Sequence, residues 1–292
     1  MKNVISIHRQ REGHWVGDGF PVHTVFHYQE QPELSPFLLL DHAGPHAFAP
    51  STKERGVGWH PHRGFETVTI VYDGEVDHHD TAGHGGRIAP GDVQWMTAGS
   101  GLLHKEYHSP EFTQRGGTFE VLQLWVNLPR EFKMTAPRYQ PLSATDIPVV
   151  AVPASTASVR VIAGAYHGVT GPAKTFTPIN LLDARIPAGE RVKLDLGEGF
   201  TAALYVLKGD VVVNGDETAH ATELVLLDRH GSEVTLEAQS DATVVVLNGA
   251  PIEEPIAGYG PFVMNTKQEI HQAFADFQRG RFGTVPTERE EA

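Results

Sequence analysis

Two short pieces of the sequence carry histidine and glutamate at alternate positions, His60-Pro61-His62 and His104-Lys105-Glu106. In an extended strand alternate residues point to the same face, so the outer two side chains of each triplet face one space. Three imidazoles and one carboxylate suit a divalent transition metal, and the chain has no cysteine to form a thiolate site. The triplets therefore predict a β-rich fold with a metal site formed by His60, His62, His104 and Glu106.

The distribution of histidine favours this interpretation over the alternative, in which each histidine is an ordinary core or surface residue. Of the 17 histidines, 13 lie within the first 108 residues and four lie in the remaining 184. A single His-x-His pair is a weak signal, but here a His-x-Glu triplet follows it on a second strand-like pattern. The clustering indicates a metal centre in the first half of the chain.

Length and composition restrict the class of protein. A chain of 292 residues has room for two domains, and 40% hydrophobic with 20% charged residues is typical of globular proteins. The net charge of −13 disfavours direct binding to nucleic acid or to an anionic membrane. The first residues lack the apolar segment of a signal peptide, and no later stretch resembles a membrane span. Together with the absence of cysteine, this predicts a cytoplasmic protein.

The segment between the triplets has the pattern of antiparallel strands. Residues Phe65–Tyr72 are strand-like and precede Asp73-Gly74, after which Glu75–His79 is strand-like again. Asp-Gly between two such runs predicts a β-hairpin. Pro90-Gly91-Asp92 predicts a further turn. Since 42 residues separate His62 from His104, we expect the two triplets to be neighbours in a small antiparallel barrel.

A short internal repeat suggests that this barrel is duplicated. The run from Val71 to Val76 resembles the run from Val206 to Val211, and the glycines within them, Gly74 and Gly209, lie 135 residues apart. A spacing of this size matches a whole domain rather than a solenoid repeat. The second half contains no His-x-His or His-x-Glu triplet, so we expect a second barrel without a metal.

These patterns divide the chain into three expected parts: a metal-binding barrel over 1–138, a metal-free barrel over 139–255, and a C-terminal segment over 256–292. In the last part, Thr266-Lys267-Gln268-Glu269 has the spacing of a capping box, and Gly280 is a typical stop signal. The spacing predicts a helix over 266–279 whose apolar stripe packs on a barrel wall. The tail after Val285 is expected to be disordered.

Several longer motifs carry a resemblance to a known family. These are His60 to Val68 (HPHRGFETV), Pro90 to Gly99 (PGDVQWMTAG), His104-Lys105-Glu106, Leu122 to Leu128 (LQLWVNL) and Gly260 to Thr266 (GPFVMNT). They resemble the pirin family of the cupin superfamily, and the match covers both ends of the chain.

The resemblance implies an all-β bicupin fold, with two antiparallel β-barrels of the double-stranded β-helix type face to face and a short C-terminal helix. It implies one Fe(II) per chain in the N-terminal barrel, held by His60, His62, His104 and Glu106, although other divalent transition metals also suit these ligands. It also implies a metal-free C-terminal barrel.

The family suggests two kinds of function. Bacterial members commonly show quercetin 2,3-dioxygenase activity, in which a flavonol is opened by O2 with release of CO. For that reaction Glu106 is our candidate for both metal ligand and catalytic base, and Phe65, Trp95, Met96 and Trp125 are candidates for the substrate wall. Other members are iron-dependent regulatory proteins that bind a transcription factor or a metabolic enzyme. The ligands would be identical in both cases.

One alternative ligand remains open from the sequence alone. Many cupins use a glutamate four residues after the second histidine of His-x-His, and here that residue is Glu66. On a regular strand Glu66 would face inward with His60 and His62. Gly64 could interrupt the alternation with a bulge, and we therefore expect Glu106 to be the ligand and Glu66 to matter mainly for stability.

Overall fold

The structure, a computed structural model, describes residues 1–9 and 12–286. It consists mainly of antiparallel strands and divides into two compact units. Within the described residues, the first unit comprises 1–9, 25–38 and 145–251, and the second comprises 12–24, 39–144 and 252–286. The second unit contains both triplets and is the one that positions the candidate site.

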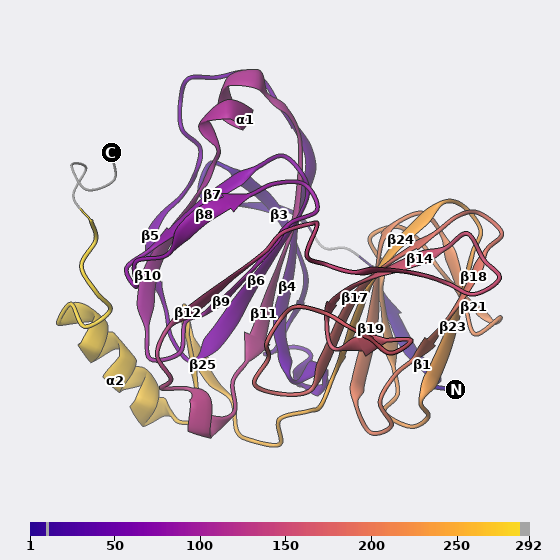
Figure 1. Cartoon of the computed structure of the whole chain (residues 1–292). Coiled ribbons are helices and arrows are strands. Elements are labelled where there is room, and N and C mark those ends of the chain that lie inside the picture. Colours follow the sequence, from indigo (N-terminus) through magenta and orange to yellow (C-terminus); the bar gives the residue numbers. More distant parts are fainter. Residues whose placement is uncertain (10–11, 287–292) are drawn as a thin grey trace. The chain divides into compact units, whose positions relative to one another are not determined.

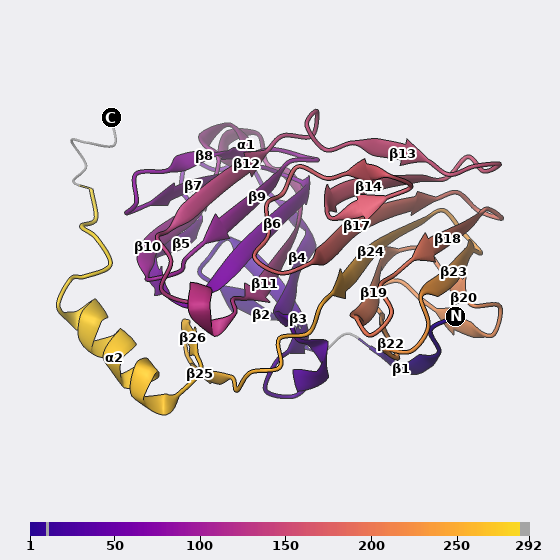
Figure 2. The same ribbon diagram turned by 60° about the horizontal axis from the view of Figure 1, so that its bottom comes forward.

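Each unit is built mainly from a seven-stranded and a four-stranded sheet (Figures 1 and 2). In the second unit, the larger sheet has the order β12 (Arg138–Leu142), β9 (Val93–Thr97), β6 (Phe65–Asp73), β11 (Gly117–Asn127), β4 (Phe37–Phe48), β3 (Phe20–His27) and β2 (His14–Val16). The smaller sheet has the order β5 (Gly56–His62), β10 (Leu102–His108), β7 (Val76–Asp80) and β8 (Gly85–Ile88).

The first unit repeats this plan. Its larger sheet has the order β1 (Val4–His8), β22 (Leu224–Leu227), β19 (Thr201–Lys208), β24 (Ala242–Gly249), β17 (Ile179–Ile186), β14 (Ser158–Ala163) and β13 (Val149–Ala151). Its smaller sheet has the order β18 (Arg191–Asp195), β23 (Glu233–Ala238), β20 (Val211–Val213) and β21 (Glu217–Ala219). A two-stranded sheet pairs β15 (Ala165–Tyr166) with β16 (Val169–Thr170). Strand by strand, the two sheet orders correspond, which supports the duplication that the sequence indicates.

The equivalent edge strands of the two units come from different places along the chain. The edge strand β12 of the second unit follows both triplets in sequence, whereas its counterpart in the first unit is the N-terminal strand β1. The edge strand therefore comes after the other strands of its sheet in one unit and before them in the other. The expected barrels also consist of separate sheets rather than one closed ring of strands.

The turn at Asp73-Gly74 is present, but the predicted hairpin is wrong. Strand β6 pairs with β9 and β11, while β7 pairs with β10 and β8, so Gly74 connects two different sheets. Gly74 has a φ of 85°, and a Cβ there would lie 2.6 Å from the Phe119 ring. Gly209, with a φ of 79°, makes the equivalent connection from β19 to β20.

The interiors of the two units differ in polarity. Along β19, the inward residues Ala202, Leu204 and Val206 belong to a continuous apolar core. In β6, Val71 belongs to an apolar cluster with Val76 and Phe119, but Thr67 and Thr69 are polar. The apolar filling of the second unit is therefore interrupted beside the two triplets.

The C-terminal segment packs on the second unit as a hairpin followed by a helix. The hairpin pairs β25 (Ala257–Tyr259) with β26 (Phe262–Met264), and α2 (Lys267–Gln278) follows it. The capping box is present, since Thr266 accepts from the Glu269 amide and the Glu269 side chain accepts from the Thr266 amide. Helix α2 contributes Ile270, Ala273 and Phe274 to an apolar cluster around Phe262 and Phe282. The predicted helix is confirmed, and residues 287–292 of the expected tail lie outside the described residues.

The remaining helices are short: α1 (Pro110–Arg115), which Ser109 caps, and two 3-10 turns, η1 (Pro32–Leu34) and η2 (Arg130–Phe132). Within the part of the chain described, neither α-helix has the length and apolar composition needed to cross a bilayer.

Candidate metal centre

The two triplets lie on directly paired strands. His104 of β10 is opposite His60 of β5, and Leu102 is opposite His62. Burial alternates along the whole of β10, so His104 and Glu106 face inward while Lys105 faces outward. The expectation that the triplets are neighbours is confirmed.

Three imidazoles converge in the second unit, where His62 and His104 are buried and His60 is half-buried. The ligand atoms of His60, His62 and His104 all lie within 4.8 Å of one another. The ring centroids of His60 and His104 are 4.1 Å apart, and the His62 centroid is 4.9 Å from each of the other two. This spacing leaves room for one ion shared by three nitrogen ligands.

In His60 and His62 a carbonyl oxygen lies beside Nδ1 and fixes the orientation of the ring. Nδ1 of His60 lies 2.8 Å from the Gly58 carbonyl oxygen, and Nδ1 of His62 lies 3.4 Å from that of Pro261. A carbonyl can only accept, so both Nδ1 atoms donate, which leaves Nε2 as the free ligand atom. Nε2 of His104 is buried and has no hydrogen-bond partner among the described residues. A metal ion would satisfy that nitrogen.

Burial keeps two of these rings neutral. It lowers the pKa of His62 and of His104 well below the ordinary histidine value, and neighbouring imidazoles lower both further. Because a histidine must be neutral to bind a metal, His62 and His104 are already in the protonation state that a ligand needs. Together with the unpartnered Nε2 of His104 and the oxygen of a nearby carboxylate, this donor set fits a divalent transition metal.

Glu106 is buried beside this cluster. We expected it to form one group with the three histidines, but it lies in a second group with His78 and His104. Its ligand oxygen lies within 4.8 Å of ligand atoms of His104 and His78, rather than in the group with His60 and His62. Gln94 donates to its carboxylate at 2.7 Å, and the Thr69 hydroxyl lies 3.3 Å from the same oxygen. The carboxylate is therefore held by β6 and β9 at the side of the three-histidine group.

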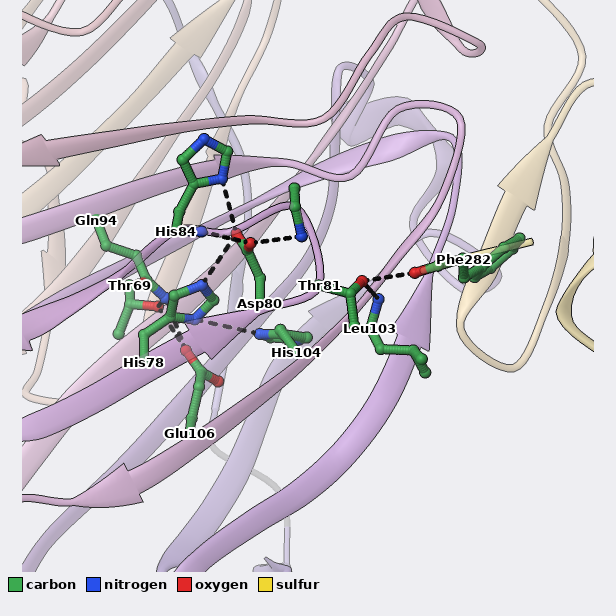
Figure 3. A network of polar contacts seen from close by, with 11 residues as sticks. Thr69, His78, Asp80, Thr81, His84, Gln94, Leu103, His104, Glu106 and Phe282 are labelled. Atoms are coloured by element: carbon green, nitrogen blue, oxygen red, sulfur yellow. Dashed lines mark hydrogen bonds and ion pairs between the residues drawn. The ribbon is translucent and has the colours of Figure 1, made fainter. Parts of the chain in front are cut away.

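Sequence reasoning missed His78. It lies directly opposite Glu106 in the β10–β7 pair, and its Nδ1 is 3.5 Å from Nδ1 of His104 (Figure 3). The alternation of buried and exposed residues in β7 places His78 inward and His79 outward. That alternation is visible in the sequence, but the partner of β7 is not, so the local pattern alone could not assign His78 to the site.

The buried carboxylate of Asp80 contacts the ring nitrogen of His78 that does not face His104. Asp80 Oδ2 lies 3.5 Å from His78 Nε2 and 3.2 Å from His84 Nδ1, and Asp80 Oδ1 accepts from the Ala82 and His84 amides (Figure 3). Burial raises the pKa of Asp80, but hydrogen bonds from His78 and His84 outweigh it and hold the pKa below its ordinary value. The charged carboxylate thus orients His78 toward His104 and Glu106.

The candidate wall residues divide between two faces. The Phe65 and Trp125 rings pack at a tilt with centroids 4.3 Å apart, and both rings lie beside His62, at 5.1 and 5.3 Å. Met96 is opposite Thr67, on the same face as Gln94. Trp95 is opposite Val68 and faces the other way. The expectation for Trp95 is therefore wrong.

Comparison with known proteins decides the family. The family model described as Pirin matches residues 19–126, and the model described as Pirin C-terminal cupin domain matches residues 181–283. The chain belongs to the pirin family. The bicupin fold class that the sequence indicates is thereby confirmed, with mostly β structure and two cupin domains made of open sheets.

Relatives of this pirin carry two kinds of name. A Pseudomonas aeruginosa protein named "Putative quercetin 2,3-dioxygenase" is 54% identical over 97% of this chain and 99% of its own. The pirin of Mus musculus is 38% identical over 91% of this chain and 89% of its own. A crystal structure of quercetin 2,3-dioxygenase from Acinetobacter baumannii has 51% identity and a TM-score of 0.95, covering 98% of this chain and all of that one. The likeness thus extends over both cupin domains.

Proposed function

We propose that this pirin is a metal-dependent dioxygenase that opens flavonols such as quercetin with O2 and releases CO, and that Fe(II) is the metal used. The observation that carries the proposal is the convergence of three inward imidazoles, of which His62 and His104 are held neutral, beside a buried carboxylate. The names of the most similar relatives support the substrate class.

In this proposal His60, His62 and His104 would hold the ion through Nε2, and Glu106 would supply a carboxylate oxygen. With four protein ligands, the ion would keep open positions for substrate and O2. When bound, the ion supplies a Lewis acid and a template for these two reactants.

Glu106 has the second role of general base. Its carboxylate would accept the proton of the flavonol 3-hydroxyl, because it is buried at the site and kept in place by Gln94. Phe65 and Trp125 would form the apolar side of the substrate site, where they can contact an aromatic ring and exclude water from it.

We further propose that the cupin domain of the first unit binds no metal. The strands equivalent to β5 and β10 are β18 and β23, where Val192 and Leu194 pair with Leu236 and Val234. All four side chains belong to the apolar core and offer no ligand atom.

The remaining proposals concern location and partners. Zero cysteines and a net charge of −13 are consistent with a cytoplasmic protein that acts on a small aromatic substrate and O2, without direct contact with nucleic acid or membrane.

The test is an aerobic assay of iron-loaded protein with quercetin, in which CO release is measured alongside loss of flavonol absorbance. The variant His60→Ala/His62→Ala, treated with the same iron, is the control. Metal-dependent turnover that the control lacks is the expected result. If loaded protein leaves quercetin unchanged, the alternative applies, in which this pirin is an iron-dependent regulatory protein that binds a transcription factor or a metabolic enzyme.

A further inference from the structure

The C-terminal segment of the second unit, residues 252–285, directly contacts the loop that follows His62. The Pro261 carbonyl lies 3.4 Å from Nδ1 of His62 and also accepts from the Arg63 amide at 3.3 Å. The Val263 amide in turn donates to the Arg63 carbonyl at 3.0 Å. A candidate metal ligand and the residue after it are therefore bonded on one side by the hairpin β25–β26.

Arg63 extends this connection to helix α2. Its guanidinium is buried, donates to Asp276 at 2.9 Å and to the Ser100 carbonyl at 2.7 Å, and lies 4.6 Å from the centre of the Phe282 ring. The hydrogen bond from Arg63 lowers the pKa of Asp276, so the carboxylate stays charged. Separating a buried ion pair leaves an uncompensated charge, which is strongly unfavourable. The pair between Arg63 and Asp276 therefore favours the docked position of α2 against the loop after His62.

A second connection reaches His104. The Thr81 hydroxyl donates to the Phe282 carbonyl and accepts from the Leu103 amide at 3.0 Å (Figure 3). Leu103 also packs against the apolar cluster that includes Phe262 and Phe282. The residue before His104 is thus bonded, through one hydroxyl, to the chain just after α2.

A third connection fixes Gly64. The ammonium of Lys133 is buried and donates to the carbonyl oxygens of Gly64 and Val263 at 2.8 and 2.9 Å. A Cβ on Gly64 would lie 2.0 Å from the Val263 carbonyl oxygen, so the two backbones approach closely. Both triplets therefore have neighbouring residues held by the C-terminal segment.

We propose that residues 252–285 are part of the metal centre, so that docking of helix α2 and metal binding stabilise one another. Arg63 and Asp276 act as positioning residues, since they touch neither the metal nor substrate and act through His62. The proposal rests on metal binding at the proposed site and is independent of oxygenase activity.

The physical reason is reciprocity. If docking of the segment holds His62 in its ligand orientation, metal affinity is higher in the docked state. By linkage, the metal must then favour docking by the same factor. Helix α2 would therefore be docked more firmly in the metal-bound protein than in the metal-free protein. This difference does not depend on any catalysis.

Hydrogen exchange on the wild-type full-length protein tests the coupling, with Ni²⁺ as an air-stable probe. Ni²⁺ binding to the variant His60→Ala/His62→Ala measures binding by other histidines and is subtracted as background. At saturation we expect the amides of Lys267–Gln278 to exchange about tenfold more slowly, a typical coupling factor. Helix α1, in the same unit but without these contacts, is the internal control and should change much less.

Variants test the positioning residues. Asp276→Asn removes the charge that Arg63 contacts, and we expect it to weaken Ni²⁺ affinity about tenfold, as measured by chelator competition. The matched control is Arg281→Gln, because Arg281 contacts the other oxygen of the same carboxylate at 2.9 Å and its side chain is largely exposed. Its affinity should stay within about twofold of wild type.

Ni²⁺ bound at the site with unchanged exchange in α2, or equal affinities in Asp276→Asn and wild type, would overturn the coupling and leave the proposed metal site intact. Absence of specific Ni²⁺ binding would overturn both. Should Asp276→Asn fail to fold, the exchange comparison still decides, because it needs only wild-type protein.

Discussion

Thr97 donates a 2.7 Å hydrogen bond to the carboxylate of Glu66, on the face of β6 opposite to the face that carries Thr69. Thr69 is the β6 residue beside Glu106, so the carboxylates of Glu66 and Glu106 lie on opposite sides of the seven-stranded sheet. The reason lies in the break between β5 and β6, where Gly64 has a φ of 88° and interrupts the alternation that begins at His60. This geometry favours Glu106 over Glu66 as the acidic ligand.

Metal content should depend on the first triplet. Purified, iron-loaded protein is expected to hold about one metal per chain, and His60→Ala/His62→Ala almost none, because two of three converging imidazoles are lost. Elemental analysis measures this directly. Equal metal in both proteins would rule out the proposed centre.

The two glutamates should respond differently to the same substitution. Glu106→Gln is expected to weaken iron retention and to abolish quercetin turnover, whereas Glu66→Gln should retain both, since Glu66 hydrogen-bonds to Thr97 on the other face. Iron content and turnover are measured side by side. Loss of metal from Glu66→Gln alone would mean that the ligand assignment is wrong.

Glu66 should make stability depend on pH. Burial raises its pKa from 4.5 to about 7, although a hydrogen bond from Thr97 opposes the shift. Between these values the unfolded chain has released the proton and the folded chain keeps it, so the unfolded state binds fewer protons and stability falls as pH rises. The loss amounts to roughly 3 kcal/mol at most.

The measurement is urea unfolding of wild type and Glu66→Gln at several pH values. The variant cannot lose a proton, so its stability relative to wild type should increase from pH 4.5 to 7 and level off above that range. If the difference in unfolding free energy between Glu66→Gln and wild type does not depend on pH, Glu66 does not titrate in this way.

His78 and His79 form a matched pair for testing the residue that sequence reasoning missed. His78→Ala should weaken metal retention about tenfold, as for other residues that orient metal ligands, because it removes the group between Asp80 and His104. His79→Ala changes an exposed neighbour on the same strand and should bind metal like wild type. Chelator competition compares them, and equal affinities would exclude His78 from the centre.

Lys2 should stabilise the first unit without affecting the metal. Its ammonium is buried and donates to the carbonyl oxygens of Phe200, Asp228 and Arg229 at 3.2, 3.3 and 3.0 Å. Lys2→Met leaves these acceptors without their donor and is expected to cost about 1–3 kcal/mol of unfolding free energy. In Lys2→Met, hydrogen exchange of the backbone amides in β19 and β22 should be faster than in wild type, while the metal content stays constant. A fall in metal content would link Lys2 to the other unit.

The sequence by itself determined the features that depend on neighbours along the chain. Alternation within His60–His62 and His104–Glu106 placed each pair on one face, because successive residues of a strand point to opposite sides. The capping box at Thr266 placed helix α2 for a similarly local reason. The longer motifs that resemble pirins identified the family and the bicupin fold.

The tertiary structure decided which strands pair, because those choices depend on residues far apart in sequence. It placed β7 beside β10, which brings His78 to the site, and made Gly74 a connection between sheets rather than a hairpin. It also brought Pro261, Asp276 and Phe282 to the residues next to the two triplets. A pattern within a short segment does not specify contacts between residues some 200 positions apart. The surroundings of the candidate metal centre were therefore visible only in the folded chain.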